Sequence, residues 1–258
     1  MVQFEDKTVE VEAVSFEDNS RKNIRTVVCR EFPLTIFVNG REMVTTLCSP
    51  SDLEDLVVGL LVSENLVGSA NEIVRIDMDL PEQIARVQIK ADHMSDNLFK
   101  PLIATGGGKS ASDAPGAVRP IATPLEISPA QADRLMDEFL TSSAVYARTR
   151  GVHSAAWASP DSILVFRDDI GRHNALDKVF GSCLRSGLDA ASGLVILSGR
   201  VSSEMLLKVA RRQVPVLMTK AVPTDLGIQL ADELGISLAG RGSRGSLTVY
   251  SHAWRIKV

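Results

Sequence analysis

The chain has 258 residues, of which 45% are apolar and 23% charged, a balance typical of a globular protein that buries its core without disulfides or metals. Its net charge of −4 argues against tracking along a nucleic-acid backbone, which usually requires a basic excess. The N-terminus lacks a basic and then apolar leader, and no apolar run reaches the roughly 18 residues of a membrane span. We therefore expect a cytoplasmic protein that binds neither nucleic acid nor membrane.

Cysteines and histidines give no sign of a metal site. Cys29, Cys48 and Cys183 are far apart, and none belongs to a Cys-x-x-Cys pair. This usage predicts reduced thiols that serve mainly as small apolar residues. The four histidines are equally dispersed, and no metal-binding spacing or Gly-x-Ser-x-Gly elbow occurs. The sequence therefore predicts no bound metal and no serine hydrolase.

The first third of the chain is expected to be β-rich with one helix. Alternating residues predict strands over 10–16, 25–30, 34–38, 43–47 and 85–90, with Asn39-Gly40 as a hairpin turn. Ser51 and Glu54 have the spacing of a capping box at the start of a helix. The apolar residues of that helix share one face and predict a core position: Leu53, Leu56, Val57, Leu60 and Leu61.

From residue 128 onward, helical and strand patterns alternate. Helices are expected over 129–140, 174–185, 203–212 and 224–234, and strands over 154–158, 162–167, 194–197, 215–219, 237–239 and 247–250. This alternation predicts a largely parallel sheet covered on both faces. We expect two domains: a β-rich N-terminal domain over 1–124, which includes a Gly-rich interdomain loop, and an α/β domain over 125–258. Ligands of such sheets bind at the carboxyl ends of the strands.

The interdomain loop is a first candidate for anion binding. Gly106, Gly107 and Gly108 allow backbone N–H groups to approach a ligand closely, and Lys109 adds a positive charge. A P-loop is excluded because Ile103 stands where that motif requires glycine. A flexible linker is the alternative interpretation.

A second candidate follows the strand that ends near residue 167. Arg172 and His173 are expected to project from a turn at Gly171, beside a helix that Asn174 caps. His173 would act as a proton donor or a phosphate ligand. A solvated loop is the alternative.

Three further turns have a similar composition. Ser198, Arg200 and Ser203 follow one strand, and Lys220 follows the next. The last loop has two arginines among glycines and serines: Arg241, Gly242, Ser243, Arg244, Gly245 and Ser246. Arginine recognises phosphate as a planar fork, so these turns predict cofactor-binding residues, although the last loop would also suit a disordered tip.

Several strings in the chain are long enough to indicate a family. Gly-Arg-His-Asn-Ala-Leu-Asp-Lys occupies 171–178, Ser-Gly-Arg-Val-Ser-Ser-Glu occupies 198–204, and Gly-Val-His-Ser occupies 151–154. With Val249-Tyr250-Ser251-His252 near the end, the chain resembles the FdhD family of formate dehydrogenase accessory proteins over almost its whole length.

The resemblance implies a sulfur carrier that acts in cofactor maturation. Such a protein takes sulfur as a persulfide from a cysteine desulfurase and passes it to the molybdenum (or tungsten) bis-guanine-dinucleotide cofactor of formate dehydrogenase. The resemblance also implies a homodimer and a three-layer C-terminal α/β domain similar to cytidine deaminases, without their zinc. Guanine nucleotides should then bind as mimics of the cofactor.

One departure from the family concerns the sulfur chemistry. The family has Cys-Gly-x-Cys-Gly-Lys in the interdomain loop, and its two cysteines, the catalytic positions, fall on Ala104 and Gly107. Because a persulfide requires a thiol, cofactor binding carries over better than sulfur transfer.

Four hypotheses about function remain open. The first is a cofactor-binding chaperone that transfers no sulfur. The second is a sulfurtransferase that uses Cys29, Cys48 or Cys183, and the third is a metal-free, hydrolase-like enzyme on the same scaffold. A purely structural partner of the dehydrogenase would leave the basic turns unexplained.

Overall fold

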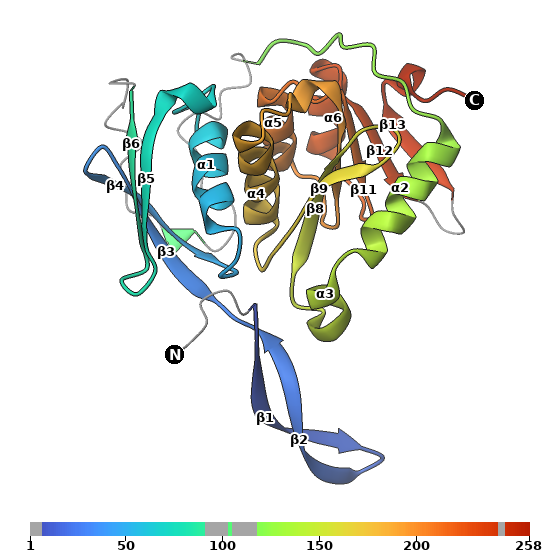
Figure 1. Ribbon diagram of the computed structural model, residues 1–258. Coiled ribbons are helices and arrows are strands. Elements are labelled where there is room, and N and C mark those ends of the chain that lie inside the picture. Colours follow the sequence, from blue (N-terminus) through green and yellow to red (C-terminus); the bar gives the residue numbers. More distant parts are fainter. Residues whose placement is uncertain (1–6, 91–102, 105–117, 242–245) are drawn as a thin grey trace.

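The computed structural model describes residues 7–90, 103–104, 118–241 and 246–258, and two sheets organise them (Figure 1). The first sheet has the strand order β5 (Ile73–Asp79), β6 (Ile84–Ile89), β3 (Phe32–Val38), β4 (Arg41–Cys48) and β7 (Ile103–Ala104). The expected hairpin joins β3 and β4, and both Asn39 and Gly40 have the positive φ (48° and 80°) that a tight turn of this kind requires.

The helix α1 (Leu53–Ser63) covers the first sheet, and its predicted apolar face is confirmed. The predicted capping box is wrong. Asp52 is the N-cap, in a left-handed conformation with φ 52°, and its side chain makes no cap hydrogen bond. The acidic groups are instead held by distant cations, because Asp52 pairs with Arg167 (3.4 Å) and Glu54 pairs with Arg185 (2.5 Å).

The second sheet has the order β13 (Leu247–Ser251), β12 (Ser237–Arg241), β11 (Val216–Thr219), β10 (Leu194–Leu197), β8 (His153–Ala158) and β9 (Ile163–Asp169). Only β10 with β11 and β11 with β12 pair in parallel, and the other pairings within this sheet are antiparallel. The expectation of a largely parallel sheet is therefore wrong. Only the central strands β10, β11 and β12 are parallel, and the flanking strands β8, β9 and β13 pair antiparallel with their neighbours. The mixed α/β class is confirmed.

Helices cover both faces of the second sheet, as expected. On one face lie α4 (Arg172–Arg185), α5 (Ser203–Arg211) and α6 (Asp225–Glu233). On the other lies α2 (Pro129–Thr141), which begins at the N-cap Ser128. Short 3-10 segments occur at Ala70–Glu72, Ala190–Ser192 and Ala253–Arg255. Alternate side chains of the central strands enter two separate apolar cores, one on each face.

The two sheets are joined through a close contact of α1 with α4 (Figure 1). A Cβ added to Gly59 would lie 1.8 Å from the carbonyl oxygen of Asp177, and one added to Gly181 would lie 1.9 Å from that of Asp55. Two glycines therefore let the helix backbones approach more closely than any side chain would allow. The predicted domain boundary near residue 124 stays a prediction.

An antiparallel ribbon precedes the first sheet. It consists of β1 (Thr8–Glu17) and β2 (Ser20–Cys29) and projects from the body of the molecule (Figure 1). The sequence predicted two separate strands, whereas Asp18 and Asn19 form a two-residue turn with φ of 48° and 61°. In the part of the chain that the structure describes, no helix is long and apolar enough to cross a membrane.

Candidate functional site

The predicted basic turns that the structure describes lie along one edge of the second sheet. Because β10, β11 and β12 run in parallel, their carboxyl ends at Leu197, Thr219 and Arg241 share that edge. Strand β8 is antiparallel to β10 and begins there at His153, and its partner β9 ends there at Asp169. Strand β13 also begins there, at Leu247 opposite Arg241. The topology therefore brings four strand ends and two strand starts together, as the position of ligand sites in α/β sheets predicts.

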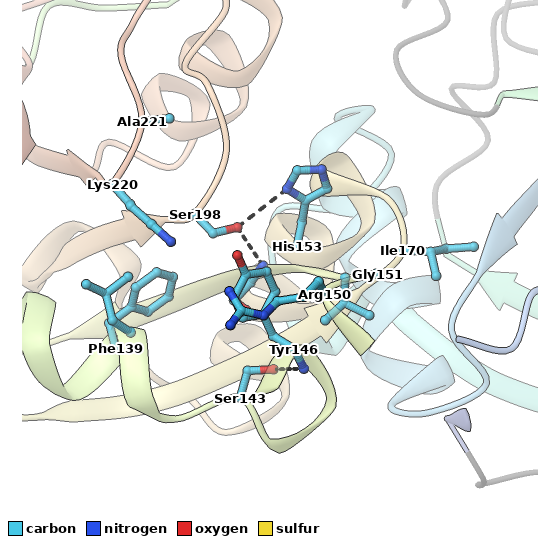
Figure 2. Close-up of a pocket in the computed structure, with 13 residues that line it drawn as sticks. Phe139, Ser143, Tyr146, Arg150, Gly151, His153, Ile170, Ser198, Lys220 and Ala221 are labelled. Carbon is cyan, nitrogen blue, oxygen red and sulfur yellow. Dashed lines mark hydrogen bonds between the residues drawn. The ribbon is translucent and has the colours of Figure 1, made fainter. Parts of the chain in front are cut away.

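A cavity of about 470 Å³ opens at this edge (Figure 2). Its lining comes from the end of α2, the short helix α3 (Ala144–Thr149), the start of β8 and the loops after β9, β10 and β11. Two residues predicted from sequence, Ser198 and Lys220, line it. The volume lies within the range of small-molecule sites.

One wall of the cavity consists of an aromatic ring in contact with two cations. The guanidinium carbon of Arg150 lies 5.3 Å from the centroid of the Tyr146 ring, and Lys220 Nζ lies 5.4 Å from it. Both distances are in the range of cation–π contacts. The two cations lower the pKa of the Tyr146 phenol, Arg150 by hydrogen bonding and Lys220 chiefly by its charge. Lys220 was predicted from its place after a strand, whereas no pattern in the sequence singled out Tyr146 or Arg150.

His153 lines the cavity, and Arg172 and His173 form a cluster with it outside the lining. Ser198 Oγ lies 3.5 Å from His153 Nδ1 and accepts a hydrogen bond from the Ser154 N–H. The Arg172 side chain lies near His153, because both residues surround Gly199. A Cβ added to Gly199 would lie 3.3 Å from His153 Nδ1 and 3.6 Å from the Arg172 side chain.

Both histidines of this cluster are held neutral. Burial, followed by the nearby charges of Lys208 and Arg172, lowers the pKa of His173 to about 3. Burial and Arg172 also lower the pKa of His153. The site therefore presents its positive charge through arginine and lysine. Arg172 and His173 do not line the cavity, and a role of His173 as proton donor or phosphate ligand stays a prediction.

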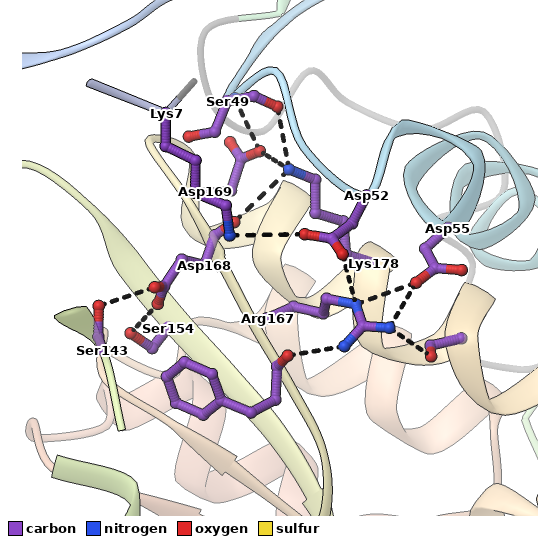
Figure 3. Close-up of polar contacts among 12 residues, drawn as sticks. Lys7, Ser49, Asp52, Asp55, Ser143, Ser154, Arg167, Asp168, Asp169 and Lys178 are labelled. Atoms are coloured by element: carbon purple, nitrogen blue, oxygen red, sulfur yellow. Dashed lines mark hydrogen bonds and ion pairs between the residues drawn. The ribbon is translucent and has the colours of Figure 1, made fainter. Parts of the chain in front are cut away.

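A buried polar network fixes the start of α4 against the first sheet (Figure 3). Lys178 Nζ lies 2.6 Å from Asp169 Oδ2 and donates to the Ser49 carbonyl at 3.1 Å. Asp169 also accepts the N–H groups of Ser49 (2.9 Å) and Gly171 (2.8 Å). Every group in this network has a partner, which is what a buried charge requires.

The predicted cap of α4 is corrected by the same network. The N-cap is Gly171, and the helix begins at Arg172, so Arg172 and His173 lie in its first turn and not in a preceding loop. Asn174 lies inside the helix, where its amide donates to the Leu47 carbonyl (2.8 Å) and to Asp169 Oδ1 (3.1 Å). Asp169 Oδ1 accepts both the Gly171 N–H and the Asn174 amide, so Asn174 links the start of α4 to the end of β9 and to β4.

A second buried carboxylate anchors α3. Asp168 accepts the hydroxyl of Ser143, the N-cap of α3, at 2.7 Å and that of Ser154 at 2.6 Å (Figure 3). The short helix that bears Tyr146 is thereby tied to β8 and β9.

Other predicted residues do not reach the cavity. Arg200 is exposed and Ser203 half-buried, and neither lines it. Arg241 turns toward α2, where its guanidinium lies 2.6 Å from the Asp137 carboxylate. Ser246 is exposed at the start of β13 and is likewise absent from the lining.

Part of the prediction falls outside the described residues. These positions are Gly106, Gly107, Gly108, Lys109, Gly242, Ser243, Arg244 and Gly245. Of the two positions that correspond to the family's cysteines, only Ala104 is described, and its backbone pairs with Thr46 of β4.

The three thiols differ in their surroundings. Cys48 and Cys183 are buried, and burial raises the pKa of each to about 12. Cys29 is half-buried at the end of β2, and its Sγ lies 3.1 Å from Thr149 Oγ1. A Cβ added to Gly151, which lines the cavity, would lie 2.7 Å from Cys29 Sγ. Among the residues described, no group of three His, Cys, Asp or Glu side chains is arranged to hold a metal.

These features define an α/β protein with two sheets and a cation-lined cavity at the strand ends of the second. Comparison with known proteins identifies its family: the model of the FdhD/NarQ family matches residues 29–257, and the chain belongs to that family.

Individual relatives agree over nearly the full length. A protein of Geobacillus kaustophilus named sulfur carrier protein FdhD is 40% identical over 235 residues, 89% of each chain. One of the same name from Bacillus subtilis is 36% identical over 251 residues, 94% of this chain and 95% of its own. The crystal structure of "a putative formate dehydrogenase accessory protein" from Desulfotalea psychrophila superposes with a TM-score of 0.81, at 26% identity, covering 97% of this chain and 99% of that one. The family resemblance seen in the sequence is confirmed.

Proposed function

We propose that this protein is an accessory factor in the maturation of formate dehydrogenase and that it binds the molybdenum bis-guanine-dinucleotide cofactor as its cargo. The names of its relatives, sulfur carrier protein FdhD and formate dehydrogenase accessory protein, support the role. The observation that carries the binding proposal is the cavity whose wall holds Arg150 and Lys220. Cations of this kind suit the pyrophosphate of a dinucleotide.

The size of the cavity limits how much of the cofactor it holds. A volume of about 470 Å³ suits one nucleotide-sized ligand, so we propose that a single guanine-dinucleotide arm enters. Because burial and neighbouring cations keep His153 and His173 neutral, the negative charge of the ligand would be met by arginine and lysine.

The test is binding together with function in the cell. Guanosine diphosphate at about 100 times its dissociation constant should stabilise the protein by roughly 2.7 kcal/mol. Lys220→Met should reduce this effect, whereas Lys90→Met, which removes an exposed lysine directly after β6 of the other sheet, should not. In a strain that lacks its own accessory protein, the wild type should restore formate dehydrogenase activity. Absence of any thermal shift with guanine nucleotides would contradict the proposed cargo.

A sulfur-transfer role has one specific candidate thiol. Burial and a pKa of about 12 make Cys48 and Cys183 poor nucleophiles, whereas Cys29 is half-buried beside the cavity. In this second proposal the Cys29 thiolate attacks the terminal sulfur of a persulfide on a cysteine desulfurase. A Cys29 persulfide forms, and the desulfurase cysteine leaves as its thiolate.

Mass spectrometry separates the two proposals. After incubation with a desulfurase and free cysteine, the sulfurtransferase should carry one additional sulfur atom on Cys29, and Cys29→Ser should carry none. A protein that binds guanosine diphosphate but acquires no sulfur would be a cofactor-binding chaperone.

We also propose that the protein is a cytoplasmic homodimer. A monomer's mass measured by light scattering would contradict the dimer.

A further inference from the structure

We propose that Arg150, Tyr146 and Lys220 form the seat of the anionic group within the cavity, with the phosphate between the two cations and the phenol hydroxyl donating to it. This inference rests on the proposed function, because it names which of the basic groups at the sheet edge hold the pyrophosphate. The seat lies on the wall formed by α3 together with Lys220, one of the several residues for which the sequence predicted cofactor binding.

The backbone of Arg150 is the first observation in its favour. Arg150 ends α3 in the left-handed conformation, with φ 55° and ψ 12°. That conformation is disfavoured for a side chain with a Cβ, and glycine is the usual residue at such a helix end. The following residue is itself a glycine, Gly151, and yet the strained position holds an arginine that lines the cavity. Eight other described residues that are not glycine also have a positive φ, but Arg150 alone among the nine lines the cavity.

The second observation is that the two cations lack acidic partners. Across the described part of the chain, no carboxylate lies within 4 Å of Arg150 or Lys220. Arg241, by contrast, is already paired with Asp137 at 2.6 Å. Two cations that contact one aromatic ring and have no carboxylate partner leave positive charge at the cavity wall, which an anion would compensate.

The third observation concerns the rigidity of the wall. Ser143, the N-cap of α3, accepts the Tyr146 N–H at 2.9 Å and donates its hydroxyl to buried Asp168 at 2.7 Å. Lys220 is fixed from the other side, since its N–H donates to the Leu197 carbonyl at 3.0 Å. The backbone that carries each cation is therefore held in place by hydrogen bonds, which lowers the entropy lost when a ligand binds.

The chemistry of the wall defines the ligand class. Two cations at similar distances from one ring suit a diphosphate, whose charge is spread over several oxygens. The Tyr146 hydroxyl, which accepts a hydrogen bond from Arg150, adds a donor for an oxyanion. The seat should therefore bind inorganic pyrophosphate and guanosine diphosphate and have little part in binding guanosine, which has no phosphate.

Calorimetric titration with these three probes tests the proposal in the full-length protein. Arg150→Gly should weaken pyrophosphate and guanosine diphosphate by about tenfold or more, since it removes a charge-assisted contact. Its melting temperature should equal or exceed that of the wild type, because glycine relieves the strained φ. Tyr146→Phe, which keeps the ring and removes the hydroxyl, should weaken both by a smaller factor. Arg148→Gln removes the same charge from an exposed position on α3 and should leave both affinities unchanged.

The outcomes separate this inference from the proposed function. Weaker diphosphate binding by Arg150→Gly and Lys220→Met, with guanosine binding unchanged, would support the seat. If the wild type binds guanosine diphosphate and Arg150→Gly binds it equally well, the seat is overturned and the proposed function stands. If the wild type binds neither diphosphate, the proposed cargo is overturned, and the seat with it.

Discussion

The ammonium group of Lys178 lies 2.6 Å from the carboxylate of Asp169, and both side chains are fully buried. Asp169 ends β9 at the edge that carries the cavity, and Lys178 lies on α4, two turns into the helix. The pair also accepts and donates hydrogen bonds with Ser49, which precedes α1. One buried ion pair therefore fixes the strand end, the helix and the first sheet relative to one another.

Removing one member of this pair should be strongly destabilising. Lys178→Met leaves the Asp169 carboxylate buried without its counter-charge, and we expect the free energy of unfolding to fall by about 3–5 kcal/mol. Urea denaturation measures the effect. Lys257→Met, which breaks the exposed pair with Glu126 at 3.6 Å, should cost less than about 1 kcal/mol. Equal losses in the two variants would contradict the role assigned to the buried pair.

The contact between α1 and α4 gives a second prediction. In Gly59→Ala the new Cβ would lie 1.8 Å from the backbone oxygen of Asp177, which cannot move aside as a side chain would. We expect a loss at or above the upper end of the about 1–3 kcal/mol typical of overpacking. Gly68→Ala, whose Cβ would meet nothing closer than the Glu72 carboxylate at 3.5 Å, is the matched control. Thermal unfolding of both variants decides the point.

Local patterns in the sequence were sufficient for most of the elements. The alternation in β3 and β4 with Asn39-Gly40 between them, and the apolar face of α1, each depend on neighbours in the chain. Long-range contacts decided the rest. The predicted cap at Ser51 failed because cations more than a hundred residues away hold Asp52 and Glu54.

The site was predictable only in outline. Basic turns at strand ends indicated which sheet edge would be functional, and Ser198 and Lys220 do line the cavity there. Tyr146 and Arg150 were missed because α3 is only six residues long and has no apolar periodicity to identify it. The string from Gly171 to Lys178 signalled a family, yet Asn174 and Lys178 serve the structure rather than a ligand.

The depressed pKa of His173 predicts a specific dependence of stability on pH. The folded-state pKa is about 3, compared with 6.5 for a free histidine, so the unfolded chain takes up the proton first. The stabilisation from the neutral ring is complete above pH 6.5 and is lost as the pH falls toward 3. Between pH 7.5 and 5 this single group should cost roughly 2 kcal/mol.

The variant His173→Gln isolates this contribution. Arg172, His153 and Lys208 surround the ring, and Glu204 lies 3.8 Å from its Nε2, so the comparison must be made between two proteins that share these groups. Urea unfolding at pH 7.5 and pH 5 should show a smaller decrease for His173→Gln than for the wild type. Parallel decreases would show that the acid sensitivity arises elsewhere.

The three thiols should react in a defined order. Alkylation requires the thiolate, and burial both raises the pKa of Cys48 and Cys183 to about 12 and excludes the reagent. We therefore expect iodoacetamide at pH 8 to modify Cys29 in the folded protein, and Cys48 and Cys183 only after unfolding in urea. Peptide mass spectrometry of samples taken over time gives the order directly. Modification of Cys48 or Cys183 at the rate of Cys29 in the folded state would mean that these cores open readily, and it would remove the reason for singling out Cys29 as a sulfur acceptor.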